Sequence, residues 1–355
     1  MAKKQEIPQK ILIYIERDAL EEIIICDDDY PNLNHIFNNH AIVLVDLPDK
    51  ELTELLEDDE SAICQLNKND VAIYALEDYF ALLKDDNSSL EDKTRAMFFL
   101  DISKEQADAL SEKYGIIVQS VHSIDDSALQ LSFKKNLDKE EDVSGGSNNG
   151  WNNLLKRLNL PPSNSMIITD NYLLQNDVGG ESIGFENLKL ILDAILPKTL
   201  GVVFHLLIVT PMPLKISPEK ANQLYGRLKA YLRTIRDYEI LLEIVFNKTI
   251  HPRKIISNYY VLVCDKGFQL FHPRKTTQVN QENEITLTSV LHDTSRFCGD
   301  TVLVISYKDI AKIKEVCQNT TKQVLGDVQD PSIKILGTST ADKRLRNRLL
   351  NTVNV

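Results

Sequence analysis

The chain has 355 residues, of which 43% are hydrophobic, and this is enough for about two globular domains with cores of their own. Its longest apolar run, Leu200–Val209, is half of the ~20 residues that a membrane span needs, and residues 1–9 are too polar for a signal peptide. The five cysteines form no CxxC pair, which excludes a zinc site or disulfide framework and predicts a cytoplasmic protein.

The net charge of −12 is unevenly distributed. Residues 1–145 carry 14 Lys and Arg against 33 Asp and Glu, a net of −19, whereas the remainder carries 26 against 19, a net of +7. A positive potential raises the local concentration of anionic ligands, so the second half is where we expect an anion to bind. The acidic first half is suited to docking a protein partner or acting as an effector.

Short apolar strands alternate with amphipathic helices through the first 120 residues. We predict strands at Lys10–Ile15, Ala41–Val45, Met97–Leu100 and Ile116–Val121, and helices at Lys50–Leu56, Ser61–Leu66, Asp70–Lys84 and Ser103–Tyr114. The last helix has the clearest ends, because Ser103 and Gln106 have capping-box spacing and Gly115 follows as a C-cap. This alternation predicts a Rossmann-like, three-layer α/β domain over residues 1–135.

Three of the predicted strands in this domain are followed or ended by acids, namely Glu16, Asp46 and Asp101. Carboxylates that meet at the carboxyl edge of a parallel sheet could hold Mg²⁺, as in nucleases whose sheets resemble the PIN fold. Acids in these positions also start loops and cap helices, and an acidic domain supplies many of them by chance. The domain has no glycine-rich phosphate loop, so we expect no nucleotide cofactor, and Mg²⁺ is the one cofactor considered.

Residues 136–150 separate the two halves. This stretch holds charged residues followed by Ser, Gly and Asn, without apolar periodicity, and is typical of a linker. A second α/β domain is then expected over residues 151–355. We predict strands at Met166–Thr169, Val202–Val209, Ile240–Phe246, Tyr259–Cys264 and Thr301–Ser306, helices at Trp151–Leu158, Phe185–Leu196, Pro218–Tyr238 and Asp309–Val316, and a basic amphipathic tail at Ala341–Leu350.

The most informative motif lies between two of these strands. His251, Arg253 and Asn258 form the pattern His-x-Arg-x4-Asn, which has the spacing of the His-x-Lys-x4-Asp motif of the phospholipase D superfamily. A histidine at a strand end can attack phosphorus, and a neighbouring cation can neutralise the phosphate oxygens. A guanidinium grips two oxygens at once, so Arg253 favours phosphate binding over turnover.

Residues 151–320 resemble the phospholipase D-like domain at the carboxyl end of microtubule-interacting-and-trafficking (MIT) proteins and its prokaryotic relatives. The resemblance is carried by Asp170 and Tyr172 after a strand, by the motif around His251, and by Gly267 in a strand turn. Pro252 stands where the family has an acidic residue. The resemblance implies a degenerate site that binds an anion, and anionic lipid is the ligand in that family, whereas the wider superfamily includes nucleases.

A second His-Pro-Arg-Lys run follows 21 residues after the first, and the two runs would form one cationic patch if they met across a hairpin. They are otherwise two unrelated basic loops. The predicted phosphate-binding residues are His251, Arg253, Lys254, Asn258, Asp170, Tyr172, His272, Arg274 and Lys275.

A complete phospholipase D site needs two histidine motifs, and this chain has one degenerate copy, which a homodimer would double. We therefore expect a binding module without turnover that recognises a polyanion, with bacterial nucleic acid favoured over anionic lipid. The first alternative is a phosphodiesterase or nuclease, with His251 as the catalytic residue of a dimer or with a metal site at Glu16, Asp46 and Asp101. The second alternative is an adaptor that binds anionic membrane lipid.

Overall fold

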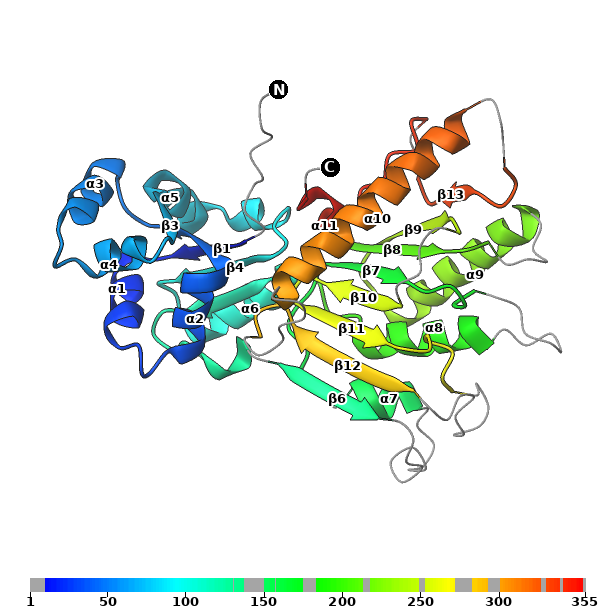
Figure 1. Cartoon of the computed structure of the whole chain (residues 1–355), viewed down its shortest axis with the longest axis horizontal. Helices are drawn as coiled ribbons and strands as arrows, with labels where there is room; N and C mark the ends of the chain where they lie inside the picture. The colour runs from blue at the N-terminus through cyan, green and yellow to red at the C-terminus, as the bar shows by residue number, and fades with distance from the viewer. Residues whose placement is uncertain are drawn as a thin grey trace.

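The computed structural model of the chain has a mixed α/β fold, as predicted, with two sheets that lie side by side in Figure 1. We call residues 10–129 the first unit and the remainder the second unit. The structure describes residues 10–129, 131–136, 150–156, 158–174, 183–212, 218–248, 253–271, 283–292, 301–326, 330–338 and 341–353.

The first unit is built on a five-stranded parallel sheet with the order β3-β2-β1-β4-β5. Its strands are β1 (Ile11–Ile15), β2 (Ala41–Val45), β3 (Ala72–Ala75), β4 (Ala96–Leu100) and β5 (Ile117–Ser120). Its helices are α1 (Arg17–Ile25), α2 (Pro31–His40), α3 (Asp49–Glu57), α4 (Ala62–Lys68), α5 (Glu77–Asp85), η1 (Asn87–Leu90), α6 (Lys104–Tyr114) and η2 (Ser127–Leu129). The order reverses beside β1, and in open α/β sheets ligands bind at such a switch point, beyond the carboxyl ends of the strands.

Alternate residues of the central strands form the two cores of this unit. Ile11, Ile13 and Ile15 pack in one cluster with side chains from α1 and α2, whereas Tyr14 and Phe98 pack in another with side chains from α5 and α6. Successive side chains of a strand point to opposite faces, so helices cover the sheet on both sides. The predicted three-layer arrangement is confirmed.

The prediction of one helix over Asp70–Lys84 is wrong. Asp70 adopts a left-handed backbone (φ 63°), Ala72–Ala75 pairs with β2 as the edge strand β3, and only Glu77–Asp85 is helical. A strand of four residues is too short to show its own periodicity, and its apolar side chains fit a helical pattern equally well.

The second unit contains an eight-stranded mixed sheet with the order β13-β9-β8-β7-β10-β11-β12-β6. Its strands are β6 (Ser132–Asn136), β7 (Ser165–Thr169), β8 (Phe204–Thr210), β9 (Ile240–Phe246), β10 (Lys254–Ser257), β11 (Tyr260–Cys264), β12 (Glu284–Ser289) and β13 (Lys334–Leu336). Its helices are α7 (Gly150–Leu155), α8 (Ile183–Ile195), α9 (Pro218–Ile235), α10 (Val302–Leu325) and α11 (Arg348–Asn351). The neighbours β7, β8 and β9 are parallel, and the other pairs are antiparallel.

Two boundaries in the second unit differ from the predictions. Strand β6 pairs with β12, so residues 132–136 belong to the second sheet although they were assigned in part to the first domain and in part to the linker. Residues 137–149 of the predicted linker lie outside the described residues. The predicted strand Thr301–Ser306 is the start of the long helix α10, which Thr301 caps by accepting a hydrogen bond from the Val304 N–H.

Buried polar contacts join the two units. The Tyr259 hydroxyl donates to the carbonyl of Ala96 and accepts from the Ile117 N–H at 3.0 Å, and both partners belong to the first unit. Arg95 is 3% exposed and donates to the hydroxyl of Ser306 at 2.8 Å. One hydrophobic cluster contains side chains of both units, so the units form a continuous packed body.

Candidate functional site: an acidic pocket in the first unit

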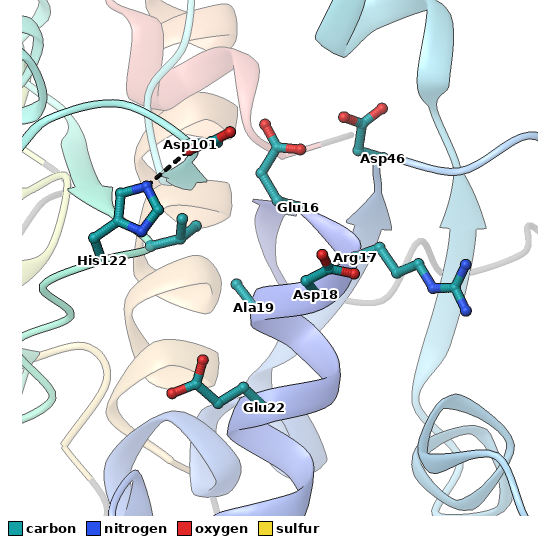
Figure 2. A pocket seen from close by; sticks show the side chains of 9 residues that line it. Glu16, Arg17, Asp18, Ala19, Glu22, Asp46, Asp101 and His122 are labelled. Carbon is teal, nitrogen blue, oxygen red and sulfur yellow. Dashed lines mark hydrogen bonds and ion pairs between the residues drawn. The ribbon is translucent and has the colours of Figure 1, made fainter.

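A pocket of about 310 Å³ opens at the carboxyl edge of the five-stranded sheet. Figure 2 shows the carboxyl groups of Glu16, Asp46 and Asp101 on the same side of this edge, with Glu22 farther along α1. The pocket lies where the sequence predicted that the acids after β1, β2 and β4 would meet. Its lining comprises Glu16, Arg17, Asp18, Ala19, Glu22, Asp46, Asp101, Val121 and His122.

Glu16 and Asp46 form a close carboxyl pair. Burial raises the pKa of Glu16 to about 7, and the neighbouring Asp46 carboxylate contributes to the rise, because its negative charge favours the protonated form of Glu16. Two neighbouring carboxylates repel each other when both are ionised, so the pair is most stable when one of them is protonated or when a cation binds. Lys84 opposes the shift, and its ammonium lies 3.7 Å from the Asp46 carboxylate.

Asp101 has a different partner from the other two acids. Its carboxylate is 2.8 Å from Nε2 of His122, and the dashed line in Figure 2 marks this contact. Both side chains are about two-thirds exposed, at 64% and 68%. The arrangement is that of a histidine oriented by a carboxylate, which is a common form of general acid or base.

The sequence analysis did not identify His122. The residue comes directly after the predicted strand Ile116–Val121, and the rule that selected the acids after three other strands applies to it as well. The guanidinium of Arg17 contacts Glu21 at 2.9 Å and also Glu51, so this cation is neutralised beside the pocket.

The described residues contain no group of three or more His, Cys, Asp or Glu side chains arranged to hold a metal ion. The predicted set of Glu16, Asp46 and Asp101 therefore does not form a closed cage. Mg²⁺, however, keeps several waters and is usually bound by one or two carboxylates together with substrate phosphates. The neighbouring carboxyl groups of Glu16 and Asp46 suit an open site of that kind.

The second predicted site, at the end of β7, is centred on a buried aspartate. Asp170 is fully buried, and its carboxylate accepts hydrogen bonds from the backbone N–H groups of Tyr172 and Phe268, both at 2.6 Å. Burial raises the pKa of Asp170, while these hydrogen bonds and the charge of Arg253 oppose the rise. The Arg253 guanidinium lies over the Tyr172 ring, 5.4 Å from its centroid, and donates to the carbonyl of Asp265.

The other two described members of the predicted phosphate set do not face this site as expected. Lys254 is mostly buried and pairs with Asp309 of α10, so it is not an exposed cation. Asn258 follows the opposite end of β10, is fully buried, and donates to the carbonyl of Gly115 at 3.2 Å and to Asn164 at 3.1 Å. Asn258 therefore joins the two units and is not positioned beside Arg253.

The remaining predicted phosphate-binding residues, His251, His272, Arg274 and Lys275, lie outside the described residues. The structure therefore brings Asp170, Tyr172 and Arg253 together at one end of the sheet. It does not test the cationic patch that the two His-Pro-Arg-Lys runs would form.

Neither a search of protein-family models nor a search of curated proteins gives a match to this chain. Within the part of the chain that the structure describes, every helix is too short or too polar to cross a membrane. Function is therefore inferred from the acidic pocket and from the site around Asp170 and Arg253.

Proposed function

We propose that the chain is a phosphodiesterase that hydrolyses nucleic acid in the acidic pocket with the help of a divalent cation. The single observation that carries this proposal is the carboxyl pair of Glu16 and Asp46, which lies in a 310 Å³ pocket at the switch point of a parallel sheet. A pair of acids that repel each other is costly to keep for stability alone, and perturbed acids in a cleft are typical of functional sites.

The residues of the pocket divide into two groups. Glu16 and Asp46 would hold the cation, which when bound would neutralise phosphate charge and lower the pKa of an attacking water. His122, which contacts Asp101 and lines the same pocket, would take the proton of that water or donate one to the leaving oxygen. In the overall reaction, water is added across a P–O bond to give a phosphomonoester and an alcohol.

Phosphate recognition by the second unit is the complementary proposal, favoured by the state of Arg253. Its side chain is half-buried, and its guanidinium is stacked on Tyr172 and makes one hydrogen bond among the described residues, to the carbonyl of Asp265. A guanidinium with an unused donor can bind a phosphate oxygen. In this arrangement the basic second unit binds the nucleic-acid backbone and the acidic first unit cleaves it, and anionic lipid is the competing ligand.

The test is a cleavage assay on single-stranded and double-stranded DNA and RNA, with Mg²⁺ or Mn²⁺ and with EDTA. We expect cleavage that requires the cation, and we expect Asp46→Asn to lower the rate by about 100-fold or more, because it removes one carboxylate of the pair. Glu57→Gln is the matched control, since Glu57 is an exposed carboxylate of the same unit that does not line the pocket.

The controls also separate the two alternatives. Cleavage that persists in EDTA and stops with His251→Ala would transfer the activity to the predicted phospholipase D-like motif. An absence of cleavage under all conditions, together with salt-sensitive binding of nucleic acid, would leave the chain as a binding module.

A further inference from the structure

A second pocket lies at the junction of the two units, where three segments distant in sequence meet. Its volume is about 480 Å³, within the usual range for small-molecule sites. The first unit contributes Glu91, Asp92 and Thr94 from the segment before β4, and the second unit contributes His205 of β8. The C-terminal segment around α11 adds Arg346 and Arg348, and Figure 1 shows this helix between the two units.

One wall of this pocket is cationic. Arg348 is 8% exposed and donates to the carbonyl of Val203 at 2.6 Å, while neither Arg348 nor Arg346 makes an ion pair within the described part of the chain. The Arg346 side chain is exposed, and its backbone N–H is fixed at 2.9 Å by the buried carboxylate of Glu243. Two guanidinium groups on one wall of a pocket suit a phosphate, which can accept hydrogen bonds from both.

The other groups of the pocket are mainly hydrogen-bond acceptors. Nδ1 of His205 donates to the carbonyl of Arg346 at 2.8 Å, which leaves Nε2 of a neutral ring as an acceptor. Burial and the charge of Arg348 lower the pKa of His205 to about 4, so the ring is neutral at pH 7. Glu91 and Asp92 are exposed carboxylates, and a carboxylate can accept hydrogen bonds from the hydroxyl groups of a ligand.

We propose that this interface pocket binds a phosphorylated sugar, either free or as part of a nucleotide. The phosphate contacts Arg346 and Arg348, and the sugar hydroxyls donate to the acceptors of the opposite side. A purely anionic ligand is disfavoured by Glu91 and Asp92, and an uncharged sugar would leave the two guanidinium groups without an anionic partner. Because the pocket is built from both units, its ligand stabilises their association.

The proposal is tested by calorimetric titration of the full chain with ribose 5-phosphate, the nucleoside 5′-monophosphates, inorganic phosphate and ribose. We expect saturable binding of ribose 5-phosphate or of a nucleoside monophosphate, and these two probes separate the free sugar phosphate from the nucleotide. Inorganic phosphate and ribose should bind more weakly. Arg346→Ala should weaken binding about 10- to 100-fold, since it removes a charged hydrogen bond to phosphate.

Arg344→Ala is the matched control, because Arg344 is an exposed arginine of the same segment that does not line the pocket. It should bind as the unchanged chain does.

Three results would overturn the proposal: no saturable binding of any sugar phosphate, equal binding of inorganic phosphate, or unchanged affinity after Arg346→Ala. Asp46→Asn removes a carboxylate of the acidic pocket and should leave this binding intact, so the outcome is independent of the proposed phosphodiesterase activity.

Discussion

The two sheets use an acid after a strand in opposite ways. Asp170 after β7 is fully buried, and two backbone N–H groups bind its carboxylate. Glu16 after β1 is only partly buried, and the neighbouring carboxyl group of Asp46 helps to raise its pKa. Asp170 provides the hydrogen-bond acceptor that two buried N–H groups need, and it thereby stabilises the fold. Glu16 instead faces a like charge in an open pocket and is available to bind a cation.

The largest effect that would sharpen this comparison is expected at Asp170. Asp170→Ala leaves the N–H groups of Tyr172 and Phe268 buried without an acceptor, which should lower the free energy of unfolding by roughly 2–5 kcal/mol. Urea unfolding measures the change. Asp170→Asn keeps one oxygen acceptor and should cost less, and an unchanged unfolding midpoint for Asp170→Ala would contradict the structural role.

A smaller effect is expected at Glu243 in the middle of β9. Burial raises the pKa of Glu243 to about 7, from 4.5 in the unfolded chain, although hydrogen bonds from the N–H groups of Arg346 and Asn347 oppose the rise. The folded state therefore holds an extra proton between these values, and stability falls as pH rises from about 4.5 to about 7.

The full shift of the Glu243 pKa corresponds to roughly 3 kcal/mol of stability. Glu243→Gln should remove most of this dependence, which unfolding midpoints measured at pH 5 and pH 8 would show. If the variant kept the full loss of stability between those two pH values, the buried acid would not be its source.

The smallest effects concern the two neighbouring cations of the predicted phosphate site. Lys254→Ala leaves Asp309 mostly buried without its partner and should cost about 2 kcal/mol of stability. Arg253→Ala should cost about 1 kcal/mol, mainly the stacking on Tyr172, and should weaken nucleic-acid binding roughly tenfold.

Chemical denaturation and a salt-controlled binding assay measure these two losses separately. The distinction between the two cations would fail if Lys254→Ala reduced binding and left stability unchanged.

The acidic pocket was predictable because a parallel sheet brings the carboxyl ends of its strands to one edge. Once the strands before Glu16, Asp46 and Asp101 were assigned correctly, their meeting at this edge followed. The same reasoning, applied to the strand before His122, would have added this residue to the pocket. Which acid would pair with which residue was not predictable, since it depends on side-chain directions and on burial. The pairing of Asp101 with His122 is a result of the structure alone.

The phosphate motif shows where sequence spacing fails. Arg253 and Asn258 are five residues apart along an extended segment, which separates them by about 16 Å. One residue therefore lies at the Asp170 end of the sheet, whereas the other is buried against the first unit. Likewise, the apolar start of α10 fits a strand as well as a buried helix, because a short apolar run carries no periodicity.

The measurement that tests the central contrast most directly is the thermal stability of the chain at pH 8 with and without Mg²⁺ or Mn²⁺. A bound cation relieves the repulsion between Glu16 and Asp46, so the account predicts a midpoint that rises with cation concentration. This rise should disappear in Asp46→Asn and persist in Glu57→Gln. A midpoint that does not respond to either cation, or that rises equally in Asp46→Asn, would contradict the assignment of this pair as the cation site.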